Sequence, residues 1–238
     1  MKVSIVIPAY NEERYLGACL QSIVDHDNEN LLEVIVVDNK STDHTDQITR
    51  EFNHHKVRLI CEPTKGPNFA RQAGFKEAKG EIIATIDADT RVPDGWFEEL
   101  QKVFSNPKVV GLSGPYDYYD LPFIKRTFVY ILWKYLGMIA HVFTGFVVYG
   151  GNFAGRKSAL DKIGGFDANI VFYGDDANTG RRLHHIGKVL FDPRFYIWTS
   201  ARRLKAQGIA RICWIYGVNF ISEAVSGKPW TPQHKDFR

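Results

Sequence analysis

Two acidic residues, Asp87 and Asp89, stand two positions apart at the end of an apolar segment and could bind a cation together. The segment Ile82–Ile86 predicts a short buried strand. Alternate side chains of an extended chain point the same way, so both carboxylates can face one site. Mg²⁺ or Mn²⁺ suits such oxygen ligands, especially where diphosphate oxygens complete the coordination shell. The alternative is a solvated turn, because an Asp-x-Asp pair alone is not specific.

Short apolar segments alternate with segments of helical spacing before and after this pair. Predicted strands are Val3–Ile7, Val34–Val37, Val57–Cys61, Ile82–Ile86 and Val109–Gly114. Predicted helices begin after a cap at Asn11, after a cap at Ser41 or Thr42, at Phe69 and at Pro93. This alternation predicts an α/β fold whose parallel sheet is covered on both faces. Ligands of such sheets bind beyond the carboxyl ends of the strands, where Tyr10, Asn11, Glu12, Asp38, Asp87 and Asp89 collect.

The composition narrows the class of protein. The 238 residues are 45% hydrophobic and 24% charged, as in an ordinary globular protein. A net charge of +3 is too small to indicate nucleic acid as a partner. Three scattered cysteines indicate a reducing compartment without structural zinc, and no signal peptide is expected, so we expect a cytoplasmic protein. The turn Pro8-Ala9-Tyr10-Asn11 lacks the glycine pattern of dinucleotide-binding dehydrogenases.

Taken in order, several motifs resemble those of the family 2 glycosyltransferases with the GT-A fold. The matching segments are Val6-Ile7-Pro8-Ala9-Tyr10-Asn11-Glu12, Val36-Val37-Asp38-Asn39-Lys40-Ser41-Thr42-Asp43, Gly66-Pro67-Asn68-Phe69-Ala70-Arg71-Gln72-Ala73-Gly74, Asp87-Ala88-Asp89, Gly150-Gly151-Asn152, Gly164-Gly165-Phe166-Asp167 and Gly174-Asp175-Asp176. The resemblance covers roughly residues 3 to 203. It implies a single Rossmann-like domain over 1–206, with a central, mostly parallel sheet flanked by helices. Residues 1–115 would form the nucleotide-sugar-binding half, residues 116–206 the acceptor half, and residues 207–238 a helical tail.

The resemblance also implies a nucleotide-sugar donor, usually UDP-linked, inversion at the anomeric carbon, and Mn²⁺ or Mg²⁺ as cofactor. The residues it places around the donor are Pro8, Ala9, Tyr10, Glu12, Asp38, Arg71, Asp87, Ala88, Asp89, Arg202 and Arg203. Asp38 would accept a hydrogen bond from the uracil, Asp89 would bind the metal directly, and Asp87 would contact ribose or metal-bound water. Plain alternatives remain: Glu12 can cap a helix, and Arg202 and Arg203 can be surface residues. The resemblance leaves a third protein ligand of the metal in doubt, since many relatives have a His close to Ser200 and this chain has none.

The acid pair Asp175-Asp176 would carry the catalysis. In the family this position usually holds Glu-Asp, and the second acid is the catalytic base, which implies Asp176. The shorter Asp175 leaves open what the first acid contacts, and a simple acid pair at a helix N-terminus is the alternative. No Gln-x-x-Arg-Trp motif is present, so transfer of a single sugar is expected. Rival functions are a sugar-phosphate nucleotidyltransferase and a non-catalytic sugar-binding domain.

Two apolar segments remain unassigned. One runs from Phe123 to Tyr149 and is rich in aromatic residues, and no Asp, Glu, Lys or Arg occurs between Tyr135 and Gly155. It fits a membrane span, a core helix beside the acceptor, or a helix on a membrane surface. The other, Ile209 to Ile221, could pack on the domain, meet a membrane or form a homodimer. The acceptor is therefore left as a glycan, a lipid-linked or a small molecule, with peripheral contact at the cytoplasmic face of the membrane as one possibility.

Overall fold

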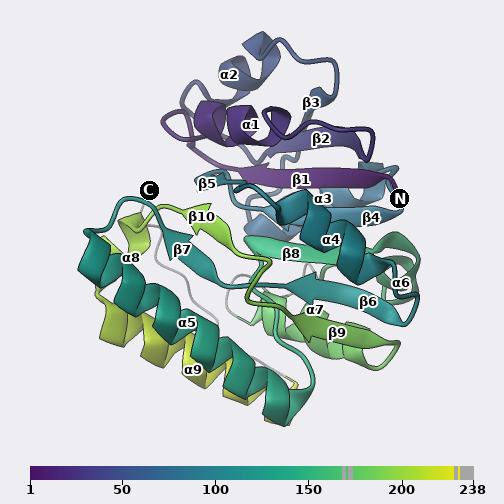
Figure 1. Ribbon diagram of the computed structural model, residues 1–238. Helices are drawn as coiled ribbons and strands as arrows, with labels where there is room; N and C mark the ends of the chain where they lie inside the picture. The colour runs from purple at the N-terminus through teal and green to yellow at the C-terminus, as the bar shows by residue number, and fades with distance from the viewer. Residues whose placement is uncertain (168–169, 171–173, 228–229, 231–238) are drawn as a thin grey trace.

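A seven-stranded sheet forms the centre of the computed structural model, which describes residues 1–167, 170, 174–227 and 230. The strand order is β3-β2-β1-β4-β8-β6-β9 (Figure 1). The strands are β1 (Val3–Ala9), β2 (Leu31–Asp38), β3 (Val57–Cys61), β4 (Ile82–Ile86), β6 (Val109–Ser113), β8 (Asn152–Arg156) and β9 (Lys188–Phe191). Only β8 runs antiparallel to its neighbours, so the mostly parallel sheet predicted from the sequence is confirmed.

Helices cover both faces of this sheet because the strands are apolar on both sides. Along β1, Ile5 and Ile7 face one hydrophobic cluster and Val6 faces the other. The first cluster is covered by α1 (Leu16–Val24), α2 (Thr45–Glu51) and α4 (Trp96–Phe104). The second is covered by α3 (Pro67–Glu77), α6 (Lys157–Lys162) and α7 (Asp175–His184). Burial on both faces explains why the strands are continuous apolar runs.

A small second sheet joins distant parts of the chain next to the Asp-x-Asp motif. It consists of β5 (Thr90–Arg91), β10 (Ile197–Thr199) and β7 (Tyr116–Tyr118). Strand β10 pairs antiparallel with β5 and parallel with β7. The backbone N–H of Ser200 also donates to the carbonyl of Asp89, 3.2 Å away. The segment after β10 is thereby held against the end of β4.

Three further helices form a layer beside the small sheet: α5 (Phe123–Thr144), α8 (Arg202–Gln207) and α9 (Ile209–Ser226). In Figure 1, α5 and α9 run side by side in the same direction. Val129 and Trp133 of α5 pack in one cluster with Leu204 of α8 and Ile212 of α9. Of the α5 side chains only Val129 and Trp133 are buried, together with Gly137. Of the alternatives for this segment, a core helix therefore does not describe α5, which packs on the domain along one side, although Phe146, Val147 and Val148 after it are buried.

The predicted beginnings of four helices are wrong by a few residues, and α3, which begins at Pro67 rather than at Phe69, is one of them. Helix α1 begins at Leu16 rather than after Asn11, and α2 begins at Thr45 rather than after Ser41 or Thr42. The polar side chains expected as caps instead tie two loops together. The Asn11 side chain accepts from the Thr42 N–H at 2.8 Å, and Ser41 Oγ accepts from the Asn11 N–H at 3.0 Å. Helix α4 begins at Trp96, after a left-handed Gly95, rather than at Pro93.

Candidate active site

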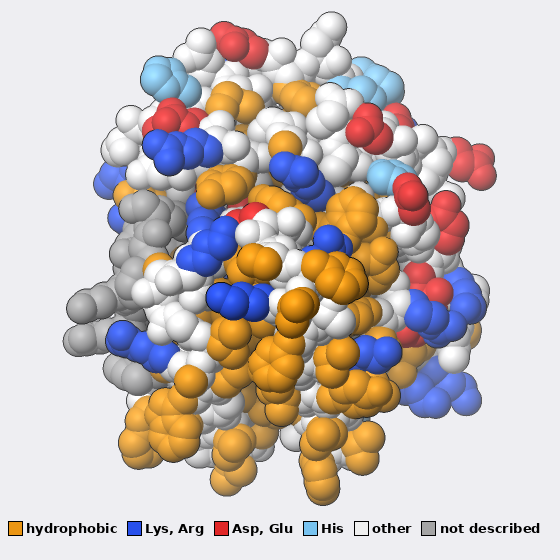
Figure 2. Space-filling model, turned by 60° about the vertical axis from the view of Figure 1, so that its left-hand side comes forward, with side chains coloured by type: hydrophobic (Ala, Val, Ile, Leu, Met, Phe, Trp, Pro, Cys, Tyr) orange, Lys and Arg blue, Asp and Glu red, His pale blue; other side chains and the backbone are white. Residues whose placement is uncertain are grey.

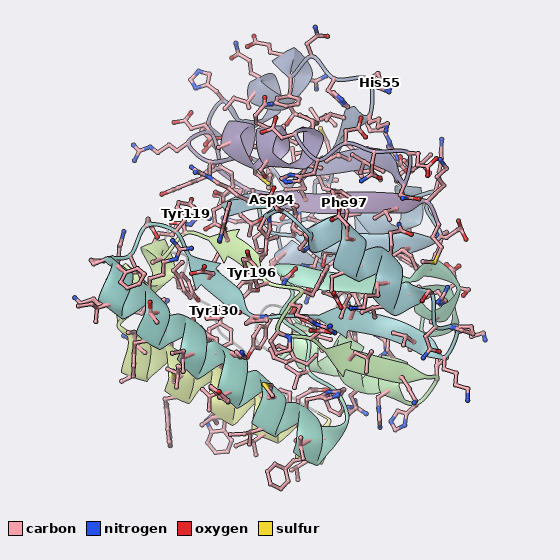
Figure 3. The ribbon with its side chains drawn as sticks, viewed as in Figure 1. His55, Asp94, Phe97, Tyr119, Tyr130 and Tyr196 are labelled. Atoms are coloured by element: carbon pink, nitrogen blue, oxygen red, sulfur yellow. The ribbon has the colours of Figure 1, made fainter. Side chains whose placement is uncertain are left out.

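A cavity of about 700 Å³ opens where β1, β4 and the beginning of α7 meet. It is lined by every predicted site residue except one: Pro8, Ala9, Tyr10, Glu12, Arg71, Asp87, Ala88, Asp89, Asp175, Asp176, Arg202 and Arg203. In Figure 2, red carboxylate atoms are visible between blue side chains near the middle of the face, above a large orange area. The structure therefore brings the two predicted acid pairs and the predicted arginines to one cavity.

Asp89 is buried and paired with an arginine from the far end of the chain. Its Oδ2 accepts from Arg202 Nε at 2.8 Å, and Arg202 Nη2 donates to Glu12 Oε1 at 2.7 Å. Burial raises the pKa of Asp89 to about 6, and the Arg202 guanidinium opposes that rise. The pairing of β10 with β5 places Arg202 here, since α8 follows β10 directly. Arg202 is thus not a surface residue but a counter-charge of the predicted metal ligand.

Arg71 joins the two acid pairs. Its Nη1 lies 2.6 Å from Asp175 Oδ2 and 3.8 Å from Asp176 Oδ1, and its Nη2 lies 3.5 Å from Asp87 Oδ1. The side chain is 9% exposed, and nearby carboxylates raise its pKa above the ordinary value although burial opposes that rise. The resemblance places Arg71 around the donor. The structure shows it between three carboxylates, where it offsets their mutual repulsion.

Asp175 and Asp176 occupy the first turn of α7, where the helix dipole favours negative charge. Burial raises the pKa of both carboxyls, and the Arg71 guanidinium opposes that rise. The two side chains differ in access, because that of Asp175 is 11% exposed and that of Asp176 is 31% exposed. Asp176 Oδ2 accepts a hydrogen bond from the Gly150 N–H at 2.8 Å. Asp176 therefore presents its second oxygen to the cavity, while Asp175 mainly holds Arg71.

Gly150 and Gly151 are explained by the carboxylates that face them. A Cβ added at Gly150 would lie 2.2 Å from Asp176 Oδ1, and one at Gly151 would lie 2.3 Å from Asp87 Oδ2. No larger residue fits at either position without moving an acid of the site. The two glycines thus let the backbone approach the acids closely.

Tyr116 is a site residue that the motifs did not reveal. Its phenol oxygen accepts from the Gly151 N–H at 2.9 Å, and its ring stacks on that of Tyr149 with centroids 5.4 Å apart. Burial raises the pKa of Tyr116 well above its usual value, so the group stays a neutral hydroxyl. The available signal was its alternation with Tyr118 in the aromatic segment, which placed both on one side of a strand.

The predicted contact of Asp38 with uracil is not supported by its position. Asp38 is buried, its Oδ1 accepts from the Ser41 N–H at 3.3 Å, and it does not line the cavity. Its neighbour Asn39 does line the cavity and donates to the carbonyl of Thr64 at 2.7 Å. Beside Asn39, which also accepts from the Gly66 N–H at 2.7 Å, Lys65 Nζ lies 2.9 Å from Tyr10 Oη. The role of Asp38 stays a prediction.

Asp87 and Asp89 fit a divalent cation that takes its other ligands from the substrate. Both are hard oxygen donors on the cavity wall, and Asp87 has 42% of its side chain exposed. Among the described residues there is no cluster of three or more His, Cys, Asp or Glu side chains arranged to hold a metal ion. Two carboxylates leave room for diphosphate oxygens and water, which is how Mg²⁺ is commonly bound. Direct coordination by Asp89 requires its ion pair with Arg202 to open or rearrange.

The chain belongs to the family described as Glycosyl transferase family 2, whose model matches residues 4–164. "Probable glycosyltransferase YdaM" of Bacillus subtilis is 28% identical over 212 residues, covering 83% of this chain and 50% of that protein. The chain thus spans half the length of this curated relative.

Solved glycosyltransferase structures share the fold. A mannosyltransferase from Pyrobaculum calidifontis, in complex with GDP-Man and Mn²⁺, superposes with a TM-score of 0.67 at 22% identity, over 88% of this chain and 62% of that one. Staphylococcus aureus TarS in complex with UDP-GlcNAc superposes with a TM-score of 0.61 at 18% identity, over 84% of this chain and 58% of that one. At these identities the likeness concerns the fold alone. The chain has the GT-A fold, as the motif order predicted.

Proposed function

We propose that this chain transfers one sugar from a nucleotide-sugar donor to an acceptor hydroxyl, with inversion at the anomeric carbon. The observation that carries the proposal is the arrangement around Arg71, which places the acid pair Asp175 and Asp176 and the Asp87 carboxylate on the wall of one cavity. A base and a diphosphate-binding end on the same cavity are what a direct displacement requires.

In the proposed reaction the acceptor oxygen attacks the anomeric carbon as the bond from that carbon to the diphosphate oxygen breaks. The acceptor proton passes to the Oδ1 of Asp176, because Oδ2 already accepts from Gly150. The departing electron pair stays on the diphosphate. Arg202, Arg203 and Lys65 line the cavity as cations and would attract its charge. A divalent ion held by Asp87 and Asp89 would supply additional neutralisation of that charge.

We propose a UDP-linked donor as the first candidate and residues 1–115 as the half that binds it. Solved relatives carry GDP-Man in one case and UDP-GlcNAc in another, so the fold accepts either base. In this chain Asn39, Lys65 and Tyr10 form the cavity wall beyond β1 and β2, where the base would lie. Selection among uracil, cytosine and guanine then depends on hydrogen bonds from this wall. Because Asn39 lines the cavity and Asp38 does not, the two variants Asn39→Ala and Asp38→Ala should be compared for nucleotide binding.

The test is a donor screen with the purified chain. We expect Mn²⁺-dependent release of UDP from a UDP-sugar, its loss with excess chelator, and weaker competition by CDP and GDP than by UDP. Asn39→Ala should weaken UDP binding more than Asp38→Ala if the cavity wall selects the base. Full turnover in excess chelator would refute the metal role, and equal binding of the three nucleotides would refute selection for uracil.

A further inference from the structure

The cavity continues past the acids into a second, apolar region between two helices. Its far end, which we name the apolar trough, is lined by Leu136, Ile139, Ala140 and Phe143 of α5 and by Phe220 and Ile221 of α9. The wall between the trough and the acids is the segment Val147–Tyr149, which leads directly to Gly150. If a bound molecule places its hydroxyl at Asp176, the rest of that molecule can therefore extend along apolar side chains of the same cavity.

The same two helices expose apolar side chains on their outer side. On α5 the side chains of Ile124, Phe128, Ile131, Tyr135, Met138 and Val142 are exposed and recur every three or four residues, which places them on one face. On α9 Trp214 and Val225 are exposed. Figure 2 shows orange side chains projecting at the bottom of the molecule, where α5 and α9 lie in Figure 1. Exposed apolar areas of this kind mark surfaces that meet a partner or a lipid.

The charge around these helices favours an anionic lipid layer. Across α5, α8 and α9, all within the described part of the chain, the one acid is Glu223, which is fully buried against Asn178 and Arg181. Lys125, Lys134 and Arg211 form no salt bridge with any described residue, and Lys125 and Arg211 are exposed. An apolar face bordered by cations without acids is the composition of helices that lie in the surface of an anionic bilayer.

Helix α5 is long and apolar enough to cross a membrane, as judged by length and composition alone. One side of it is, however, attached to the protein. Trp133 packs on Tyr149 and Tyr216, and a Cβ at Gly137 would lie 2.3 Å from the Phe191 ring. Arg126 is also bound to Asp117 through two hydrogen bonds. A helix held along its length in this way can rest in a lipid surface with its outer face only.

We propose that the acceptor is an amphiphilic lipid: its headgroup presents the hydroxyl to Asp176, its hydrocarbon chain lies in the apolar trough, and α5 and α9 rest on the anionic membrane from which it comes. This inference rests on the proposed transfer reaction and changes none of its bonds. It explains why one cavity is lined by carboxylates at one end and hydrocarbon at the other, and why the hydrocarbon end borders the exposed apolar face.

The first test measures flotation with vesicles of phosphatidylcholine and phosphatidylglycerol. We expect the protein to float at low salt and to float less as salt rises. Ile124→Glu with Val142→Glu should reduce vesicle affinity roughly tenfold or more, because two apolar side chains leave the lipid and two negative charges replace them. Neither residue lines the cavity, and both are at least 80% exposed. Leu32→Glu, at an exposed leucine of β2 outside this layer, is the matched control and should float normally.

The second test measures binding of hexyl, octyl and decyl β-glucoside below their micelle concentrations, with UDP and Mn²⁺ present. Affinity should rise by up to about fourfold per CH₂ that enters the trough. Ala140→Trp should remove this dependence on chain length while the melting temperature shows that the variant is folded. This variant separates binding in the trough from binding on the exposed face.

Each alternative has a distinct result. No flotation at low salt, together with a dimer that the Ile124→Glu and Val142→Glu variant dissociates, would show that a second copy covers this face and would overturn the inference. Affinity independent of chain length would overturn the lipid acceptor even if UDP-sugar turnover remained intact. Flotation without any UDP-sugar turnover would instead count against the proposed function, so the two failures are distinguishable.

Discussion

The two ends of the cavity, the proposed donor end and the apolar trough, differ in whether their side chains already have partners within the protein. At the donor end the charges are paired within the protein: Arg202 bridges Glu12 and Asp89, and Arg71 holds Asp175. At the trough end, α5 and α9 present hydrocarbon to the cavity and to the outside. Paired charges preserve a geometry before any ligand arrives, whereas exposed hydrocarbon gains stability only when something covers it. The donor end is thus largely ordered in advance, with the Arg202–Asp89 ion pair as the contact that opens or rearranges for a metal, and the trough end is open to a partner.

The largest expected effect on turnover is that of Asp176→Asn, because Asp176 lies where the donor end and the trough end of the cavity meet. The amide keeps the shape of the carboxylate but cannot take the acceptor proton. We expect turnover to fall roughly 10²-fold or more, with UDP and Mn²⁺ binding about unchanged. Asp175→Asn should reduce turnover less, because that side chain faces Arg71. Near-parental turnover by Asp176→Asn with a confirmed acceptor would transfer the role of base to Asp175.

The parts of the fold and of the site that depend on local sequence could be predicted, and the parts that depend on contacts between residues far apart in sequence could not. Asp87 and Asp89 were found because they directly follow a strand signal, and Asp175 and Asp176 because Gly174-Asp175-Asp176 matches a motif of the family at the beginning of a helix. The bond between Arg202 and Asp89 joins residues far apart in sequence through the pairing of β10 with β5, and no local pattern announces it. Helix starts were misplaced because Asn11 and Ser41 bond to each other's loops instead of capping. The exposure of α5 could not be predicted, since an apolar composition suits a core and a lipid surface equally.

Asp89→Ala tests the donor end by itself. We expect nucleotide binding to lose its dependence on Mn²⁺ and activity to fall to background, because one of two carboxylate ligands is gone. Removal of this buried charge also leaves Arg202 with Glu12 as its remaining carboxylate partner. Calorimetric titration of UDP with and without Mn²⁺ is the measurement, and unfolding curves provide the control for structure. Unchanged Mn²⁺-dependent binding would place the metal elsewhere.

Arg71→Gln tests the electrostatic connection between the ends through a pH profile. The guanidinium stabilises the ionised acids, so it lowers the pKa of Asp175 and Asp176 against the rise caused by burial. Its removal should raise that pKa further, and since the base acts only when ionised, the acidic limb of turnover should move to higher pH. A shift of about one to three units is expected for loss of an opposite charge at this distance. If turnover of Arg71→Gln fell by the same factor at every pH, Arg71 would have a purely structural role.

The smallest expected effect is on stability and concerns two helical glycines. Gly137 of α5 packs against the domain, whereas Gly217 of α9 faces open space. A Cβ at Gly137 of α5 would meet the Phe191 ring at 2.3 Å, and that ring is itself buried against Tyr149. At Gly217 of α9 an added Cβ would meet nothing within 4 Å.

Alanine at these two positions should therefore change the free energy of unfolding in opposite directions. Gly137→Ala should lower it by about 1–3 kcal/mol, since overpacking outweighs the gain in helix propensity. Gly217→Ala should raise it by about 0.5–1 kcal/mol, because only propensity changes. Urea unfolding of both variants beside the parent measures the difference. If both substitutions stabilised the protein, α5 would not pack on Phe191, and the one-sided attachment that leaves its outer face available for lipid would not exist.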